Sequence, residues 1–250
     1  MTAIKERPIN FSAPMVRAIL EGRKTVTRRP VKATKAHADG FIMLDHGKGW
    51  WPYNMFGDSE VDSEAMEYPI TCPYGKPGDR LWVRESWWQA GDWQATYPED
   101  DTGAWFGSRR VFYSADGTPP NEPNNSYPNG LRNGAYSAAA PNKVWRHRPS
   151  IHMDRWASRI LLEIADVRVE RLQASEGETA FESRYVAEGI HRIHHGDGAH
   201  YFHPFKSEPG PGNWADPFDA WRELWVSING ADSWNANTWV WVVEFKQVTP

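Results

Sequence analysis

A lysine and two threonines lie among three arginines in residues 22–29, a segment that reads Gly-Arg-Lys-Thr-Val-Thr-Arg-Arg. Guanidinium and ammonium groups set this densely can grip a phosphate or another polar ligand. If Lys24 lost its proton, the same segment could instead activate a threonine hydroxyl, because a hydroxyl needs a neighbouring base to become a useful nucleophile. Both chemistries stay open at this point, and Arg23, Arg28 and Arg29 would serve either of them.

Residues 143–159 form a second basic stretch, in which cations are interleaved with aromatic rings. Arginine beside tryptophan is a combination that nucleic-acid and nucleotide surfaces use. We expect His152 and Arg159 to contact a ligand there. The alternative is a solvated loop before a strand, with its tryptophans in the core. The stretch contains Lys143, Trp145, Arg146, His147, Arg148, His152, Arg155, Trp156 and Arg159.

Five of the nine histidines fall within residues 191–203. Such clusters can ligate zinc or nickel. The spacing matches no firm zinc motif, however, and the neighbouring sequence is rich in glycine, which fixes no ligand geometry. We therefore expect a polar loop over residues 191–213, and we predict neither a metal ion nor another cofactor.

The composition is that of a globular protein, with 40% hydrophobic and 24% charged residues in a chain of 250. No signal sequence and no apolar run long enough to span a membrane are visible, so we expect a cytoplasmic protein without a membrane partner. The single cysteine, Cys72, permits no internal disulfide. The net charge of the whole chain is −4, but its first 35 residues are basic, with nine basic and two acidic side chains. This excess favours a focused anionic ligand, unless the acidic remainder of the chain neutralises it.

Helix and strand signals position these segments. Ser12 is a good N-cap and Pro14 suits a first turn, so residues 13–21 should form a helix that ends at Gly22. The basic segment would then leave a helix end and enter a turn or strand. Other expected elements are strands at 9–11, 80–86, 158–172 (one long or two short) and 239–248, a helix from 175–178 to about 188–189, and a helix of about 13 residues capped by Asp216.

This order of elements indicates an α+β protein with a curled β-sheet and helices at its rim, because its strands do not alternate regularly with long helices. We expect one domain over residues 1–250. Irregular insertions are expected at about 36–75, 90–143 and 191–213.

Taken in order, these segments resemble the ASCH domain family, and most of all its larger phage and prophage members. The resemblance implies a PUA-like fold, which is a small β-barrel with a cleft, and a link to RNA or modified nucleosides. It rests on residues 9–11 with the helix that follows, on 22–28, 77–81, 186–190 and 241–246, and on 149–153 and 156–159.

One branch of this family is similar to bacterial N4-acetylcytidine amidohydrolases, in which a lysine, a threonine three residues later and a distant glutamate carry the chemistry. Carried over by motif, the resemblance implies Thr27 as nucleophile, Lys24 as its base and Glu188 as acid and base. Burial and the neighbouring arginines would lower the pKa of Lys24, and a helix C-terminus would disfavour a charged Glu188. The alternative is a charged turn with one lysine–glutamate salt bridge.

We therefore expect a protein that binds a modified nucleoside or RNA and hydrolyses an amide on an acylated base. Two rivals stay open: a non-catalytic RNA-binding module and a ribonuclease. The residues expected to bind substrate are Arg23, Arg28, Arg29, His152 and Arg159.

Overall fold

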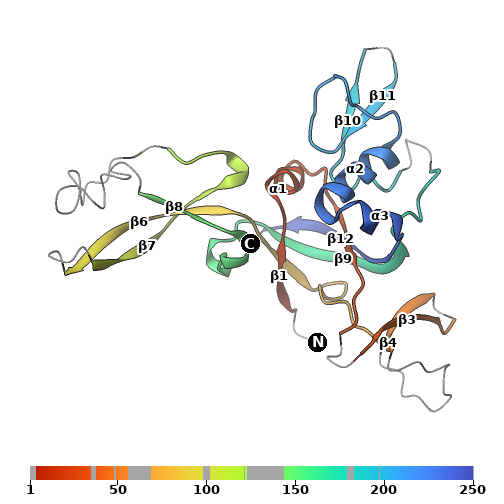
Figure 1. Ribbon diagram of the computed structural model, residues 1–250, viewed down its shortest axis with the longest axis horizontal. Coiled ribbons are helices and arrows are strands. Elements are labelled where there is room, and N and C mark those ends of the chain that lie inside the picture. The colour runs from red at the N-terminus through yellow and green to blue at the C-terminus, as the bar shows by residue number, and fades with distance from the viewer. Residues whose placement is uncertain are drawn as a thin grey trace. The chain divides into compact units, whose positions relative to one another are not determined.

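A computed structural model describes residues 4–34, 38–47, 49–55, 69–97, 102–120, 122, 144–178, 183–196 and 198–249. The chain forms two compact units. The first comprises Met1–Arg7, Ala18–Leu81 and Leu162–Thr249, and the second Pro8–Arg17, Trp82–Leu161 and Pro250. Strands predominate and helices are few, which confirms the predicted α+β class (Figure 1).

The largest sheet has five strands in the order β1-β5-β9-β12-β2. Over the described residues, β1 and β2 are its edges and no pairing closes it into a barrel. In β12, which lies between β9 and β2, consecutive residues from Val240 to Val243 are buried, so both faces of the strand are covered. The strands are β1 (Glu6–Asn10), β2 (Val26–Pro30), β5 (Arg80–Arg84), β9 (Leu161–Arg171) and β12 (Trp239–Val248).

The helices are α1 (Ala13–Leu20), α2 (Pro217–Asn229) and α3 (Ala231–Asn235). The Asp216 carboxylate accepts a hydrogen bond from the Phe218 amide at 2.8 Å, which confirms the predicted cap of α2. Ile228, whose helical spacing matches that of the buried Trp221 and Trp225, is nevertheless 51% exposed because it lies in the last turn of α2. Among the described helices, none has the length and apolar character needed to cross a membrane.

The segments predicted as irregular insertions contain antiparallel strands. Residues 36–75 include β3 (Gly40–Asp45) and β4 (Trp50–Met55), and residues 191–213 include β10 (His191–His194) and β11 (His200–His203). In the second unit, a three-stranded sheet has the order β7-β6-β8. Few of the described side chains in these strands are fully buried, so the sequence shows little of the apolar alternation that identifies a strand. The three strands are β6 (Trp87–Tyr97), β7 (Thr102–Tyr113) and β8 (Trp145–Arg148).

The predicted helix over residues 175–189 is wrong at its described ends, which are turns; residues 179–182 lie outside the described part of the chain. In a capping box, the Ser175 amide and the Glu178 carboxylate would bond to each other, but here they have other partners. The Ser175 amide donates to the Tyr185 hydroxyl at 3.0 Å, and the Glu178 carboxylate accepts from the Arg184 amide at 3.0 Å. These side chains close a loop instead of starting a helix.

Candidate functional site

The basic segment leaves α1 through a tight turn. Gly22 has φ +74°, and its amide donates to the Ile19 carbonyl at 3.0 Å, which is the glycine-ended helix that the sequence predicts. The Lys24 amide then donates a hydrogen bond to the Ala18 carbonyl at 2.9 Å. This turn brings Lys24 into an antiparallel bridge with Glu188.

Gly189 allows this bridge to form. Its φ is +97°, and a Cβ there would lie 2.8 Å from the Ala18 Cβ and 3.2 Å from the Lys24 Cβ. A residue with a side chain would be strained and would push the two segments apart. The Glu188–Gly189 pair in the sequence therefore marks a close backbone approach and not the end of a helix.

Lys24, Arg28 and Glu188 form a buried ionic cluster. The Lys24 Nζ lies 2.6 Å from the Glu188 Oε2 and donates to the Glu188 carbonyl at 3.0 Å. The Arg28 Nη1 donates to the other carboxylate oxygen at 3.0 Å. All three side chains are at most 2% exposed. Burial lowers the pKa of Lys24, and this effect outweighs the opposing effect of Glu188.

Two aromatic rings and a second carboxylate surround Arg28. Its guanidinium carbon lies 5.1 Å from the centroid of the Tyr185 ring and 5.6 Å from that of the Trp221 ring. These rings stack on each other with an interplanar angle of 12°. The Arg28 Nη2 lies 3.8 Å from the Glu170 Oε2, too far for a hydrogen bond. Sequence reasoning missed all three of these neighbours, which reach Arg28 from distant parts of the chain.

The remaining residues of the basic segment are placed differently. Thr27 is buried in β2, opposite Val243 of β12. Because neighbouring side chains of a strand point to opposite faces, Thr27 and Arg28 project to different sides of β2. Arg23 donates to the Gly189 carbonyl and also pairs with Glu21. Arg29 lies on β2 near enough to Lys24 to help lower its pKa.

Arg159 and His152, predicted to bind a ligand, belong to the second unit. Arg159 makes two hydrogen bonds to Glu85, at 2.9 and 3.1 Å, and two to Asp116, at 2.7 and 2.9 Å. Its guanidinium also lies 3.9 Å from the centroid of the Tyr113 ring. Four of its five N–H donors are therefore occupied within the protein. His152 is exposed at the end of a short 3₁₀ turn, Ser150–His152.

Part of the predicted arginine and tryptophan stretch meets two residues of β7 in the second unit. We call this group the arginine–tryptophan face and define it as Trp105 and Arg109 of β7, Arg146 and Arg148 of β8, and Trp156 of the 3₁₀ turn Arg155–Ala157. Arg146 and Arg148 each lie 5.2 Å from the Trp105 ring centroid, and Arg109 lies 5.7 Å from that of Trp156. Over the described part of the chain, no carboxylate pairs with these three arginines.

The aromatic rings of the arginine–tryptophan face are fixed by close packing. Trp87, which is 2% exposed, packs with Met153 and Ala157 and meets the Trp156 ring edge-to-face at 5.8 Å. A Cβ on Gly91 would lie 2.5 Å from the Trp105 ring, so only glycine lets this indole lie flat over the strand. The half-buried Trp105 ring and the exposed Trp156 ring are thus held in place before any ligand arrives.

The histidine segment is a hairpin rather than a loop. His191 pairs with His203 and His194 with His200 across β10 and β11. The His203 ring is 5% exposed, and its Nδ1 accepts from the Phe205 amide at 3.0 Å. Burial lowers the pKa of both His191 and His203. The described residues contain no cluster of three metal-ligating side chains; Asp197 lies outside them.

No protein-family model matches the sequence, and comparisons with curated proteins and with solved structures also gave no match.

Proposed function

We propose that this protein is a PUA-like ASCH protein that binds single-stranded nucleic acid, RNA in particular, through the arginine–tryptophan face. One observation carries the proposal: Arg146 and Arg148 both lie 5.2 Å from the ring centroid of Trp105, and neither has a carboxylate partner among the described residues. The family resemblance supports the PUA-like assignment and the link to RNA.

Single strands suit this face better than duplexes. Unstacked bases can lie on exposed indole rings, and each such stack contributes about 1–3 kcal/mol. Arginine side chains beside the rings can pair with the phosphates that join those bases. The bases of a duplex are stacked on each other and have no free faces to offer.

Fluorescence anisotropy with a labelled single-stranded RNA tests the proposal. The double variant Arg146→Ala/Arg148→Ala should weaken binding at least tenfold, since it removes two phosphate partners. Arg110→Ala is the matched control: Arg110 lies on the same sheet, but Glu122 already pairs with it at 2.5 Å. An equal loss of RNA affinity in both variants, or tighter binding of duplex than of single strand, would exclude this face as the binding site for single-stranded RNA.

A second function, hydrolysis of an amide on an acylated base, is favoured by the ionic cluster. The Lys24 Nζ lies 2.6 Å from the Glu188 carboxylate, and burial lowers the pKa of this lysine. Transfer of one proton along this contact produces a neutral amine and a protonated acid, which are the base and the acid that amide hydrolysis needs. Arg28 opposes the transfer, because it stabilises the charged form of Glu188.

In the proposed reaction, Lys24 takes the proton of the Thr27 hydroxyl as its oxygen attacks the acyl carbon, and Glu188 protonates the departing nitrogen. Water then hydrolyses the acyl-threonine ester. Thr27 and Arg28 project from opposite sides of β2, so the Thr27 hydroxyl must first be brought to the ionic cluster. Because the three charged side chains are at most 2% exposed, the site must open to admit a substrate.

Release of acetate from N4-acetylcytidine measures this activity. Thr27→Val should abolish it and Thr27→Ser should retain it, because serine keeps the hydroxyl. Turnover by Thr27→Val at the wild-type rate would exclude the threonine, and the absence of turnover by the wild type would leave the binding function alone.

A further inference from the structure

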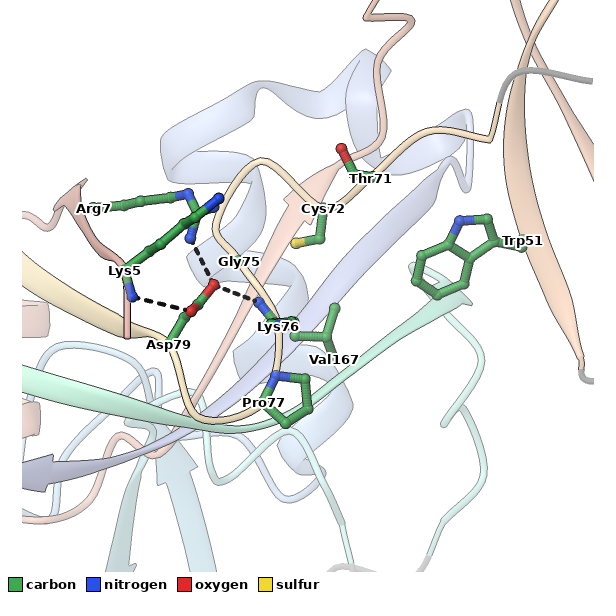
Figure 2. A pocket seen from close by; sticks show the side chains of 10 residues that line it. All are labelled: Lys5, Arg7, Trp51, Thr71, Cys72, Gly75, Lys76, Pro77, Asp79 and Val167. Atoms are coloured by element: carbon green, nitrogen blue, oxygen red, sulfur yellow. Dashed lines mark hydrogen bonds and ion pairs between the residues drawn. The ribbon is translucent and has the colours of Figure 1, made fainter. Parts of the chain in front are cut away.

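A pocket of about 530 Å³ opens in the first unit, and its described lining residues include none of the basic segment 22–29. Its volume lies within the range of small-molecule sites. Figure 2 shows Lys5 and Arg7 on one side and Trp51 on the other, with Cys72 and Val167 between them. Lys76 also lines it.

The charged side of the pocket has an excess of positive charge. Among the described lining residues, Asp79 is the one acidic side chain, and it is 4% exposed. The Asp79 Oδ2 accepts from the Arg7 Nη1 at 2.8 Å, and the Oδ1 accepts from the Lys5 amide at 3.2 Å (Figure 2). Asp79 therefore neutralises Arg7 and orients it. Among the described residues, the Nζ groups of Lys5 and Lys76 have no carboxylate partner.

The opposite side of the pocket presents a fixed aromatic ring. The Trp51 Nε1 donates to the Ile70 carbonyl at 3.0 Å, and the ring meets Trp241 edge-to-face at 5.1 Å. Two contacts in different directions hold the indole in one orientation. A flat ligand can stack on such a ring without an ordering cost to the protein.

From these two sides we infer that the pocket binds a nucleoside 5′-phosphate, with the phosphate between Lys5, Lys76 and Arg7 and the base against Trp51. Lys5 and Lys76, which have no carboxylate partner among the described residues, match a phosphate dianion, and the indole matches a base. This inference does not rest on the proposed function. A free nucleotide and the 5′-phosphorylated end of a nucleic acid present the same chemistry, so the test includes both.

Cys72 provides the readout, because it lines the pocket and is the single cysteine of the chain. A bound ligand should shield its thiol from iodoacetamide. Burial raises the pKa of Cys72, so the alkylation rate is measured at mildly alkaline pH, where enough thiolate forms. The ligands compared are AMP, adenosine, inorganic phosphate, and a short oligonucleotide with and without a 5′-phosphate.

AMP and the 5′-phosphorylated oligonucleotide should slow alkylation at lower concentrations than adenosine, phosphate or the 5′-hydroxyl oligonucleotide. Lys5→Ala and Lys76→Ala should each raise the half-protecting concentration of AMP about tenfold, the loss of one charge-assisted contact. Lys206→Ala, a lysine in the same unit outside the pocket, should leave it unchanged.

Protection by adenosine as strong as that by AMP would overturn the inference, and so would a complete absence of protection by AMP. Loss of RNA binding at the arginine–tryptophan face would not change the Cys72 readout, because that face belongs to the second unit.

Discussion

The Lys24 ammonium and the Glu188 carboxylate lie 2.6 Å apart, although 164 residues separate them in the chain, and both side chains are at most 2% exposed. A charge removed from water this completely depends on its partner, because an isolated buried charge is very costly. The contact therefore ties the turn after α1 to the segment around residue 188.

Removing the lysine should destabilise the protein strongly. Lys24→Met leaves Glu188 buried with Arg28 as its remaining partner, and we expect the free energy of unfolding to fall by about 3 kcal/mol. Urea denaturation followed by tryptophan fluorescence measures this change. Lys246→Met is the matched control, since it removes a 2.8 Å ion pair to Glu163 in which the lysine is 66% exposed, and it should cost less than about 1 kcal/mol. A similar loss of unfolding free energy in the two variants would contradict the view that burial makes the Lys24–Glu188 pair important for stability.

The glycine after Glu188 should tolerate no side chain. Gly189→Ala adds a Cβ that lies 2.8 Å from the Ala18 Cβ, in a backbone conformation that already disfavours L residues. Gly22→Ala has the same backbone strain with no heavy atom within 4 Å of the new Cβ. We expect Gly189→Ala to lower the thermal midpoint more than Gly22→Ala, with a difference of about 2 kcal/mol in unfolding free energy. If Gly189→Ala and Gly22→Ala have the same thermal midpoint, the close backbone approach at Gly189 is absent in solution.

Asp79 should make stability depend on acid pH. Hydrogen bonds from Arg7 hold the pKa of Asp79 below its ordinary value of 3.8. A carboxyl group with a lowered folded-state pKa contributes stability that is fully present above the unfolded pKa and is lost as the pH falls through the folded pKa. The difference in unfolding free energy between wild type and Asp79→Asn should thus be largest above about pH 4 and shrink below it. Urea titrations at several pH values measure this difference, and a constant gap down to the most acid pH would contradict it.

Nucleic-acid binding at the arginine–tryptophan face should depend on salt. Each cation that pairs with a phosphate of a single strand contributes about 0.7 to the slope of log affinity against log salt concentration. Arg146→Ala/Arg148→Ala should therefore reduce the magnitude of this slope by about 1.4. Trp105→Leu should weaken binding while it leaves the slope unchanged, because stacking releases no counterions. A slope that is identical in wild type and the double arginine variant would place the phosphates elsewhere.

Local signals in the sequence correctly predicted two of the helices and the last strand. Gly22 ends α1, Asp216 caps α2, and the apolar run at residues 239–248 forms β12. These features depend on backbone conformation and on neighbours within one turn or strand, so a single sequence displays them. The helix predicted after Ser175 failed because its capping groups bind Tyr185 and Arg184 instead.

The sequence by itself determined which charged side chains were available: a lysine–arginine segment after a helix, and an arginine–tryptophan stretch later in the chain. Only the tertiary structure decided their environment. It buried Lys24 against Glu188, enclosed Arg159 between two carboxylates, and left Arg146 and Arg148 beside Trp105 without an acidic partner among the described residues. Burial and pairing arise from contacts between residues far apart in sequence, and they determine whether a charge stabilises the fold or is free to meet a ligand.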